Sequence, residues 1–435
     1  MSIKKTLIKN TSLNLIGYVY LTIAAFISIP ILLRNFGQEL YGVYLLFSGI
    51  IPLMVAIDFG LSQATTRYLS LPKNSDKKRS VIWQTSFTLF FLVGLLIAAI
   101  SFISFYFFAS KSSVFSSLPS FQFLPLSIAI SLILLFNHLN ISLMTLIQSN
   151  QRFDIYNLRV LIVGTGNTLL TAFISTFTTN LVTIFFFLFS CHFITFLIFL
   201  RYACRHFSFS LPKFILDKVY SKKLFSFGLR QFVGNLASQI NIQVSKYILG
   251  LSLAVKIVPV FSIPQNVMVK GTGVVSQLTL AFFPLSASLV TKEKIKKLSR
   301  LVVGLQFSIL FIGILQVLFI YTLGDDVLHL WLNNPNFVIQ AYPILKVLSW
   351  YFLLTTITPI PTSVLDSINL PQVPSFFAVL TAILTLGSML YLVPSFGALG
   401  AAYAYVFASA ITVPLFLFVF CRAFSKYIKK TLSSV

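Results

Sequence analysis

Long apolar stretches recur along this chain, separated by short polar segments. A helix crosses the hydrocarbon core of a bilayer with about 20 apolar residues, because that core is about 30 Å thick and the helix rises about 1.5 Å per residue. By that measure the pattern predicts twelve spans, at residues 10–33, 40–69, 81–109, 121–148, 156–178, 180–201, 222–250, 256–290, 299–322, 338–366, 373–393 and 397–421. The sequence therefore predicts an all-α, polytopic membrane protein.

Lys and Arg alternate between the connections that join these spans. They gather at both termini and in every second connection, including the fourth-to-fifth connection, to which we assign Arg152 and Arg159. The remaining connections hold only four basic residues at their margins, namely Arg34, Lys111, Lys246 and Lys256. Because cytoplasmic connections collect Lys and Arg, the alternation predicts that both termini face the cytoplasm.

The longest basic connection, at residues 201–223, lies near the middle of the chain and separates six spans from six. We therefore expect an N-terminal lobe at 1–204, a basic cytoplasmic linker at 205–221 and a C-terminal lobe at 222–435. An even number of spans in each half makes the halves parallel repeats, which is a common plan for transporters. Two six-helix lobes of this kind are expected to surround a central cavity.

The composition supports a membrane protein over a soluble one. Of the 435 residues 57% are hydrophobic and only 9% are charged, which is too few charges to cover a soluble domain of this size. The formal net charge is +23, a value that would suggest nucleic-acid binding in a soluble protein. Here the basic residues lie in short connections beside apolar spans, so we interpret them as orientation signals and expect no nucleic-acid partner.

Catalytic and metal-binding patterns are not found in the sequence. The three Cys match no metal-ligand spacing, and the four His have no acidic or Cys partner at such a spacing. The segments Gly164-Thr165-Gly166 and Gly271-Thr272-Gly273 follow no strand and lack a phosphate-loop pattern. We therefore expect no metal, no cofactor and no enzymatic activity.

Polar side chains within the spans are the main indication of a functional site, because they are costly in hydrocarbon. At helical periodicity they form stripes on the first, seventh and eighth spans. The stripes consist of Asn14 and Tyr18, of Gln231, Asn235, Gln239 and Gln243, and of Gln265 and Asn266. We interpret them together as the lining of a hydrated cavity, although hydrogen bonding between helices remains the alternative for any single amide.

Charged residues within or beside the spans are mostly positive, namely Arg34, Arg230, Lys246, Lys270 and Lys346. A cavity lined by them would attract an anionic cargo. The deep acidic residue is Asp58, for which two interpretations remain open. It is either a structural partner of a neighbouring cation such as Arg67, or a site for a coupling ion or proton.

Several segments resemble a known family. Residues Leu40–Ser70 read LYGVYLLFSGIIPLMVAIDFGLSQATTRYLS, and later segments read SFGLRQFVGNLASQI, KYILG, IPQNV and LVPSFGALGAAYAYVFASAI. These resemble the Wzx-type O-antigen and polysaccharide repeat-unit flippases of the MOP superfamily. The resemblance implies a polyprenyl-pyrophosphate-linked oligosaccharide as cargo, moved by alternating access from the inner to the outer leaflet of the bacterial inner membrane.

The resemblance also implies roles for the residues in the spans. The pyrophosphate or acidic sugars would be bound by Arg230, Lys270, Lys246, Arg34 and Lys346. The sugar hydroxyls would be contacted by Gln231, Asn235, Gln239, Gln243, Asn14, Tyr18, Gln265 and Asn266. One departure concerns Lys246, because Ser245 precedes it where relatives often have Asp, which leaves the partner of Lys246 open. Membrane lipids, a polysaccharide polymerase and a chain-length regulator are the further partners that the resemblance implies.

Two other functions remain as alternatives. One is a cation-coupled small-molecule or multidrug exporter of the same superfamily, with Asp58 as its coupling site. The other is a scaffold for glycosyltransferases that transports nothing and would tolerate the loss of the charges in its spans.

Overall fold

The computed structural model describes residues 3–71, 75–116, 118–207, 213–289, 295–368 and 370–433, and all regular elements in these ranges are helical. The longer helices are α1 (Ile3–Val55), α3 (Asp76–Ile103), α4 (Phe123–Ser149), α5 (Phe153–Thr165), α7 (Leu181–His206), α8 (Lys218–Ser252), α9 (Ile257–Leu289), α10 (Ile295–Leu332), α11 (Pro335–Thr356), α13 (Gln372–Phe396) and α14 (Ala398–Ser433). The short helices α2 (Leu61–Leu69), α6 (Thr171–Ser175) and α12 (Pro359–Ser367) continue some of these after a break.

The number of spans is close to the predicted twelve. Within the described ranges, nine helical stretches are long and apolar enough to cross a membrane. The first of them, Asn14–Val55, holds two predicted spans, because Gly37 interrupts α1 with a φ of 67°. The helices α8 and α9 are not among the nine and correspond to the seventh and eighth predicted spans. The chain is therefore an all-α, multi-pass membrane protein.

Four predicted spans depart from a continuous α-helix where the hydropathy pattern showed one stretch. The span expected at 81–109 contains a π-helical turn at Ser104–Phe108. The span expected at 40–69 changes direction at Phe59 and Gly60, whose φ angles of 52° and 69° are left-handed, and continues as α2. The span expected at 156–178 contains a π-helical turn at Gly166–Leu170. The span expected at 338–366 breaks between α11 and α12. Apolarity measures the depth of a segment in the bilayer and carries no information on such breaks.

The break before α12 follows from two prolines. Pro359 and Pro361 have no N–H group and cannot continue the hydrogen bonding of α11. The carbonyl oxygen of Ile357, which an N–H at position 361 would have satisfied, instead accepts a hydrogen bond of 2.9 Å from Gln306 Nε2 on α10. A side chain from a neighbouring helix thus replaces the missing backbone donor, as an apolar environment requires.

Packing divides the chain into two compact units. We call Tyr20–Gln239 the N-terminal unit, and Met1–Val19 together with Ile240–Val435 the C-terminal unit. The lobes expected at 1–204 and 222–435, with a linker at 205–221, stay a prediction about membrane topology, whereas these units are defined by packing. Each unit has its own buried core. In the N-terminal unit Leu69, Trp83, Leu143 and Phe199 join α2, α3, α4 and α7. In the C-terminal unit Phe282, Leu298, Val364 and Phe420 join α9, α10, α12 and α14.

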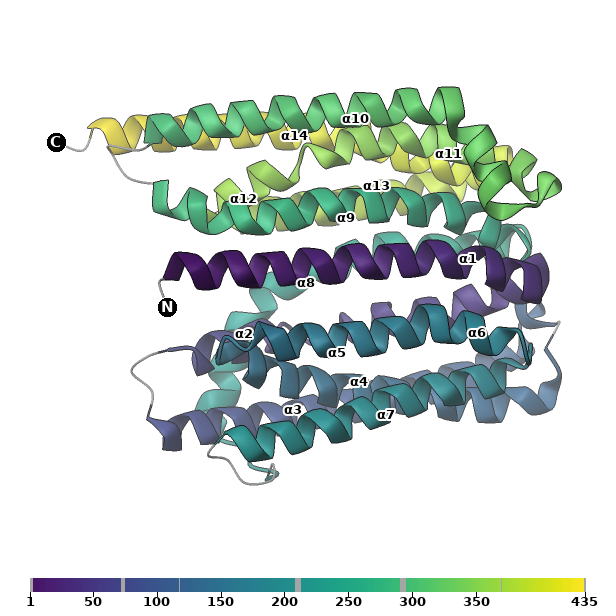
Figure 1. The fold of residues 1–435 in the computed structure, drawn as a ribbon, viewed down its shortest axis with the longest axis horizontal. Helices are drawn as coiled ribbons and strands as arrows, with labels where there is room; N and C mark the ends of the chain where they lie inside the picture. The colour runs from purple at the N-terminus through teal and green to yellow at the C-terminus, as the bar shows by residue number, and fades with distance from the viewer. Residues whose placement is uncertain are drawn as a thin grey trace. The chain divides into compact units, whose positions relative to one another are not determined.

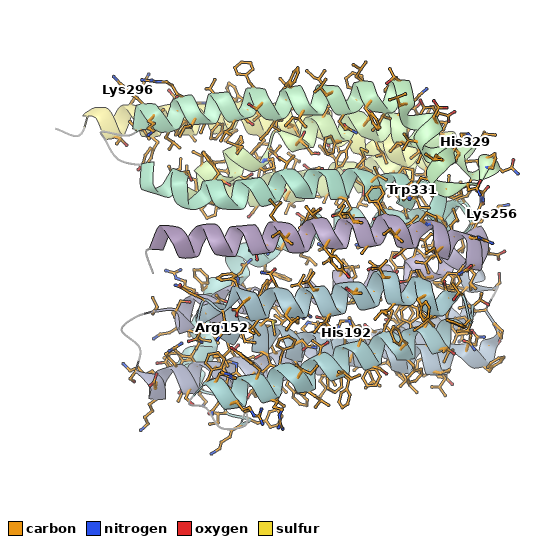
Figure 2. The ribbon with its side chains drawn as sticks, in the orientation of Figure 1. Arg152, His192, Lys256, Lys296, His329 and Trp331 are labelled. Atoms are coloured by element: carbon orange, nitrogen blue, oxygen red, sulfur yellow. The ribbon has the colours of Figure 1, made fainter. Side chains whose placement is uncertain are left out.

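The long helices of the C-terminal unit run between two opposite ends of that unit. Figure 1 shows that the start of α1, the start of α10 and the end of α14 lie at one end of this unit. Figure 2 places Lys296 at that same end, and Lys256, His329 and Trp331 at the opposite end. Lys296 belongs to a predicted cytoplasmic connection and Lys256 to an opposite one. Lys296 and Lys256 therefore lie at opposite ends of this unit, and which end faces the cytoplasm stays a prediction.

Candidate functional site

Three lysines singled out within the predicted spans lie in the C-terminal unit, and within the described residues none of them is paired with a carboxylate. They are Lys246 on α8, Lys270 on α9 and Lys346 on α11. Among the described residues the ion pairs are Arg79–Asp76, Arg152–Asp154 and His329–Asp325, and none of these involves a lysine. The positive charges of the three lysines are therefore not neutralised within the described part of the chain.

Lys246 is held by an amide. Its Nζ donates a hydrogen bond of 2.8 Å to Gln243 Oε1, and both side chains are buried, with exposures of 6% and 8%. Two predicted site residues thus meet one turn apart on α8. Lys246 therefore has the neutral amide of Gln243 as its partner. Ser245, the residue before it, contacts a different side chain.

That other contact is the buried hydroxyl of Tyr405 on α14. Ser245 Oγ lies 3.0 Å from Tyr405 Oη, and Gln265 Nε2 donates to the same oxygen at 2.7 Å. Tyr405 Oη in turn donates to the carbonyl oxygen of Asn241 at 2.5 Å. Gln265 is only 1% exposed, so it links α9 to α14 in this arrangement. Its predicted contact with sugar stays a prediction and would require these bonds to open.

Lys270 and Tyr18, predicted from two distant parts of the sequence, lie together. Tyr18 Oη donates a hydrogen bond of 2.9 Å to the carbonyl oxygen of Lys270, and Lys270 Nζ lies 5.7 Å from the centre of the Tyr18 ring. The hydroxyl of Tyr18 also lies so close to Gly273 that a Cβ there would overlap it. Lys270 is half-buried, and a cation at this distance from an aromatic face is stabilised without losing its charge.

Lys346 lies between aromatic rings. Its Nζ is 4.4 Å from the ring centre of Tyr342 on α11 and 5.5 Å from that of Tyr321 on α10. Trp350 Nε1 donates a hydrogen bond of 3.0 Å to Tyr321 Oη and fixes that ring. Lys246, Lys270 and Lys346 are thus contacted by neutral groups, and no ion pair of the described residues neutralises their charge.

The N-terminal unit contains an open polar pocket of about 590 Å³. Its polar side chains come from the turn before α2 and from α2, α4, α5 and α8: Asp58, Ser62, Gln63, Thr66, Arg67, Thr145, Gln148, Tyr156, Arg159 and Asn235. Two arginines and one carboxylate give the lining a positive balance. We call it the polar pocket.

Arg159 was not predicted as a site residue. The distribution of basic residues assigned it, with Arg152, to the connection before the fifth span, yet it lies on α5 and lines the polar pocket. Its Nη2 donates a hydrogen bond of 3.0 Å to Asn137 Oδ1, and its buried Nε has no hydrogen-bond partner in the described part of the chain. The signal that could have identified it is its spacing from Tyr156, one turn earlier on the same helix.

Asp58 is engaged by the helix that follows it. Its carboxylate accepts hydrogen bonds from Gly60 N at 2.8 Å, from Ser62 N at 3.2 Å and from Ser62 Oγ at 2.5 Å. Arg67 instead lies with its guanidinium carbon 4.3 Å from the centre of the Phe227 ring. Both residues line the polar pocket, but within the described chain they form no ion pair. Asp58 lies two residues before Gly60, the N-cap residue of α2, and its carboxylate satisfies backbone N–H groups at the start of that helix. Its role in ion coupling stays a prediction.

The remaining predicted residues differ in their exposure. Asn235 is exposed at the polar pocket, and Arg34 is exposed on α1. The half-buried residues are Asn14, Gln239 and Asn266. The side chains of Arg230 and Gln231 on α8 lie outside the described residues. Among the described His, Cys, Asp and Glu residues, no group of three could hold a metal ion.

Comparisons with known proteins identify relatives over nearly the whole chain. The sequence model of the polysaccharide biosynthesis protein family matches residues 7–290. A Shigella flexneri protein named "Putative O-antigen transporter" is 23% identical over 426 residues, which cover 97% of this chain and 99% of that protein.

Two solved structures show the fold. One is an inward-facing multidrug resistance MATE family transporter of the MOP superfamily, with a TM-score of 0.80 and 13% identity over 97% of this chain and 100% of that one. The other is the lipid II flippase MurJ in an inward closed conformation, with a TM-score of 0.71 and 16% identity over 95% and 91%. The helices described above therefore adopt the fold of MOP-superfamily transporters.

Proposed function

This chain belongs to the polysaccharide biosynthesis protein family, and on that premise we propose that it is a flippase for lipid-linked oligosaccharides. The cargo is an oligosaccharide repeat unit on a polyprenyl pyrophosphate. It passes from the inner to the outer leaflet of the bacterial cytoplasmic membrane, where it serves the assembly of O-antigen, capsule or another surface polysaccharide. Both termini face the cytoplasm in this proposal, and a polymerase and a chain-length regulator act after the flippase.

The observation that carries the proposal is the set of lysines without carboxylate partners. A central Lys in a span costs at least about 2.5–3.5 kcal/mol unless it is paired or hydrated. In Lys246, Lys270 and Lys346 that cost is only partly offset, because an amide and aromatic rings leave the charge in place. An anionic headgroup supplies the missing countercharge. The pyrophosphate of the proposed cargo is such a group, and it is absent from an uncharged or cationic drug.

The polar residues near these cations suit the sugars of the cargo. In the C-terminal unit Tyr18 lies against Lys270, and in the N-terminal unit Asn235 and Arg67 both line the polar pocket. Hydroxyl-rich sugars bind to such amides and aromatic faces through hydrogen bonds and ring contacts. The names of the O-antigen transporter and of the lipid II flippase support a cargo of this class.

The membrane potential can drive the transport without a coupling carboxylate. An inside-negative potential favours the outward movement of negative charge by about 2.3 kcal/mol per elementary charge per 100 mV. The proposal therefore requires neither a covalent intermediate nor a proton carrier in the chain. It requires that the cationic groups become accessible from each leaflet in turn.

The test is the deletion of the gene in a strain that has no second flippase. The proposal expects the lipid-linked oligosaccharide to accumulate in the inner leaflet while the surface polysaccharide is lost. Digestion of the exposed sugars on right-side-out and inverted vesicles measures the leaflet. Unchanged surface polymer and unchanged intermediates would contradict the proposal.

The alternative of a cation-coupled exporter depends on Asp58. The three hydrogen bonds that the carboxylate of Asp58 accepts are local, and they support a structural role. If the exporter hypothesis is right, overexpression should raise drug resistance and Asp58→Asn should abolish that effect. The same substitution distinguishes the two functions, because the flippase proposal expects it to be tolerated.

A further inference from the structure

A second pocket lies in the N-terminal unit, where the end of α2 meets the start of α8. Its volume is about 510 Å³, which falls in the range of roughly 300–1,000 Å³ found for small-molecule sites. The lining consists of Tyr68, Lys218, Val219, Lys222, Lys223, Ser226 and Phe227. We call it the lysine pocket. It shares no lining residue with the polar pocket. The two are adjacent, because Phe227 in its wall contacts Arg67.

The lining of the lysine pocket changes from charged to apolar along α8. Six of its residues follow one side of α8 at helical spacing, so that three exposed lysines lie toward the start of the helix and Phe227 lies deeper along it. At the start of a predicted span, this order places positive charge at the membrane surface and an apolar ring below it. Such an arrangement matches a lipid, whose phosphate lies at the surface and whose chains lie in the hydrocarbon region.

No carboxylate in the described chain neutralises these lysines. The lining holds no Asp or Glu, and none of the three lysines takes part in an ion pair of the described residues. The adjacent Asp217 is committed elsewhere, because its Oδ1 accepts a hydrogen bond of 2.9 Å from Tyr220 N in the first turn of α8. Its own N–H donates to Thr85 Oγ1 at 3.3 Å and ties the start of α8 to α3. The start of α8, which carries the lysines, is therefore held in place by its hydrogen bond to α3.

Phe227 separates the lysine pocket from the polar pocket. One face of its ring contacts the guanidinium of Arg67 at 4.3 Å, and Arg67 lines the polar pocket. Tyr68, the next residue, packs edge-on against the same ring at 6.3 Å and lines the lysine pocket. Neighbouring residues of α2 thus face two different pockets across a single aromatic ring.

We propose that the lysine pocket binds the phosphate headgroup of a membrane lipid at the cytoplasmic surface. Lys218, Lys222 and Lys223 contact the phosphate oxygens, while Val219 and Phe227 contact the first methylene groups of the lipid chain. The lipid is either a resident acidic phospholipid or a polyprenyl diphosphate, since both present a phosphate above an apolar chain. The site exists whichever cargo the protein transports.

The test uses the full-length protein in detergent micelles and counts bound lipids by native mass spectrometry. The probes are dioleoyl phosphatidylglycerol, undecaprenyl diphosphate and, as a zwitterionic reference, dioleoyl phosphatidylcholine. The test variant is the triple substitution Lys218→Gln, Lys222→Gln and Lys223→Gln. The matched control is Lys296→Gln, Lys297→Gln and Arg300→Gln, which removes the same charge from the start of α10. Thermal unfolding verifies that each variant folds.

The proposal expects the pocket variant to lose at least about tenfold in affinity for one phosphate lipid, while the control retains wild-type binding. Loss for undecaprenyl diphosphate alone assigns the pocket to a polyprenyl carrier, and loss for phosphatidylglycerol alone assigns it to a resident lipid. Ser226→Asp is a second variant, because it adds a negative charge at an exposed position without removing any packing, and it should weaken binding likewise. Wild-type binding in Ser226→Asp, or an equal loss in the control, would overturn the proposal.

Discussion

Gly60 and Gly228 lie in backbone-to-backbone contact, and neither position has room for a side chain. A Cβ at Gly60 would overlap the carbonyl group of Gly228, and a Cβ at Gly228 would overlap the carbonyl oxygen of Phe59. Gly60 also has a φ of 69°, which side-chain-bearing residues rarely adopt. The turn before α2 can therefore pack directly on α8, and this contact brings Arg67 within reach of Phe227.

The first prediction concerns this contact. Gly228→Ala should lower the free energy of unfolding by about 1–3 kcal/mol. The added methyl group would overlap backbone atoms of Phe59 and Gly60, which cannot move aside. Thermal unfolding of the purified protein in detergent measures the effect. The control is Gly304→Ala on α10, where nothing lies within 4 Å of the new Cβ and the better helix propensity of Ala should leave stability unchanged or slightly higher. Equal stability of the two variants would contradict the close contact.

The second prediction concerns Lys270. Lys270→Ala should reduce surface-polymer export at least about tenfold, because a charged hydrogen bond to a phosphate is worth about 1.5–3 kcal/mol. Membrane insertion should be unchanged, and Lys270→Arg should restore part of the export because it keeps the charge. Lys256→Ala, which removes an exposed lysine at the end of the same unit, should have no effect. Full export by Lys270→Ala would remove the cationic site from the proposal.

The third prediction concerns the hydroxyl of Tyr405. Tyr405→Phe should destabilise the protein by about 1–3 kcal/mol, since Gln265, Ser245 and Asn241 would all lose a buried hydrogen-bond partner. Tyr403→Phe is the matched control, because that residue lies on the same helix and is 41% exposed. If Tyr405→Phe and Tyr403→Phe changed the melting temperature by the same amount, the buried hydrogen bonds of Tyr405 would contribute little to stability.

The fourth prediction separates capping from ion coupling at Asp58. Asn can still accept hydrogen bonds at the start of α2, so Asp58→Asn should keep both stability and export, whereas Asp58→Ala should cost about 1 kcal/mol of stability. The measurement is thermal unfolding together with surface-polymer export. If Asp58→Asn folded normally but had no export, the carboxylate would be needed for its charge and the capping interpretation would be insufficient.

The spans could be predicted from the sequence because hydropathy is a local property. Each helix needs its own run of apolar residues, whatever its neighbours are. The breaks could not be predicted in the same way. The change of direction at Gly60 depends on a contact with Gly228, and the interruption of α1 at Gly37 depends on a φ angle that composition does not reveal.

The site was predicted in part. Periodicity placed polar residues on a common stripe of α8, but it could not show that Gln243 turns to Lys246 while Asn235 faces a pocket. The pairing of Gln265 with Tyr405 joins positions 140 residues apart, and only the packing of α9 against α14 brings them together. Arg159 was assigned, together with Arg152, to a connection because basic residues mark cytoplasmic connections. The pocket that Asn235 faces, the pairing of Gln265 and the position of Arg159 depend on contacts between residues that are distant in the sequence, and a short sequence window does not contain such contacts.

The hydrogen bond from Gln306 to the carbonyl of Ile357 makes two distant positions dependent on one another. Pro361 removes the donor that would have satisfied this carbonyl, and Gln306 supplies it from another helix. Loss of Gln306 therefore harms a chain that has Pro361 more than a chain in which that proline is replaced by Ala. We therefore expect the effects of substitutions at positions 306 and 361 to be non-additive. The break between α11 and α12 thus depends on two residues, Gln306 and Pro361, and not on a proline alone.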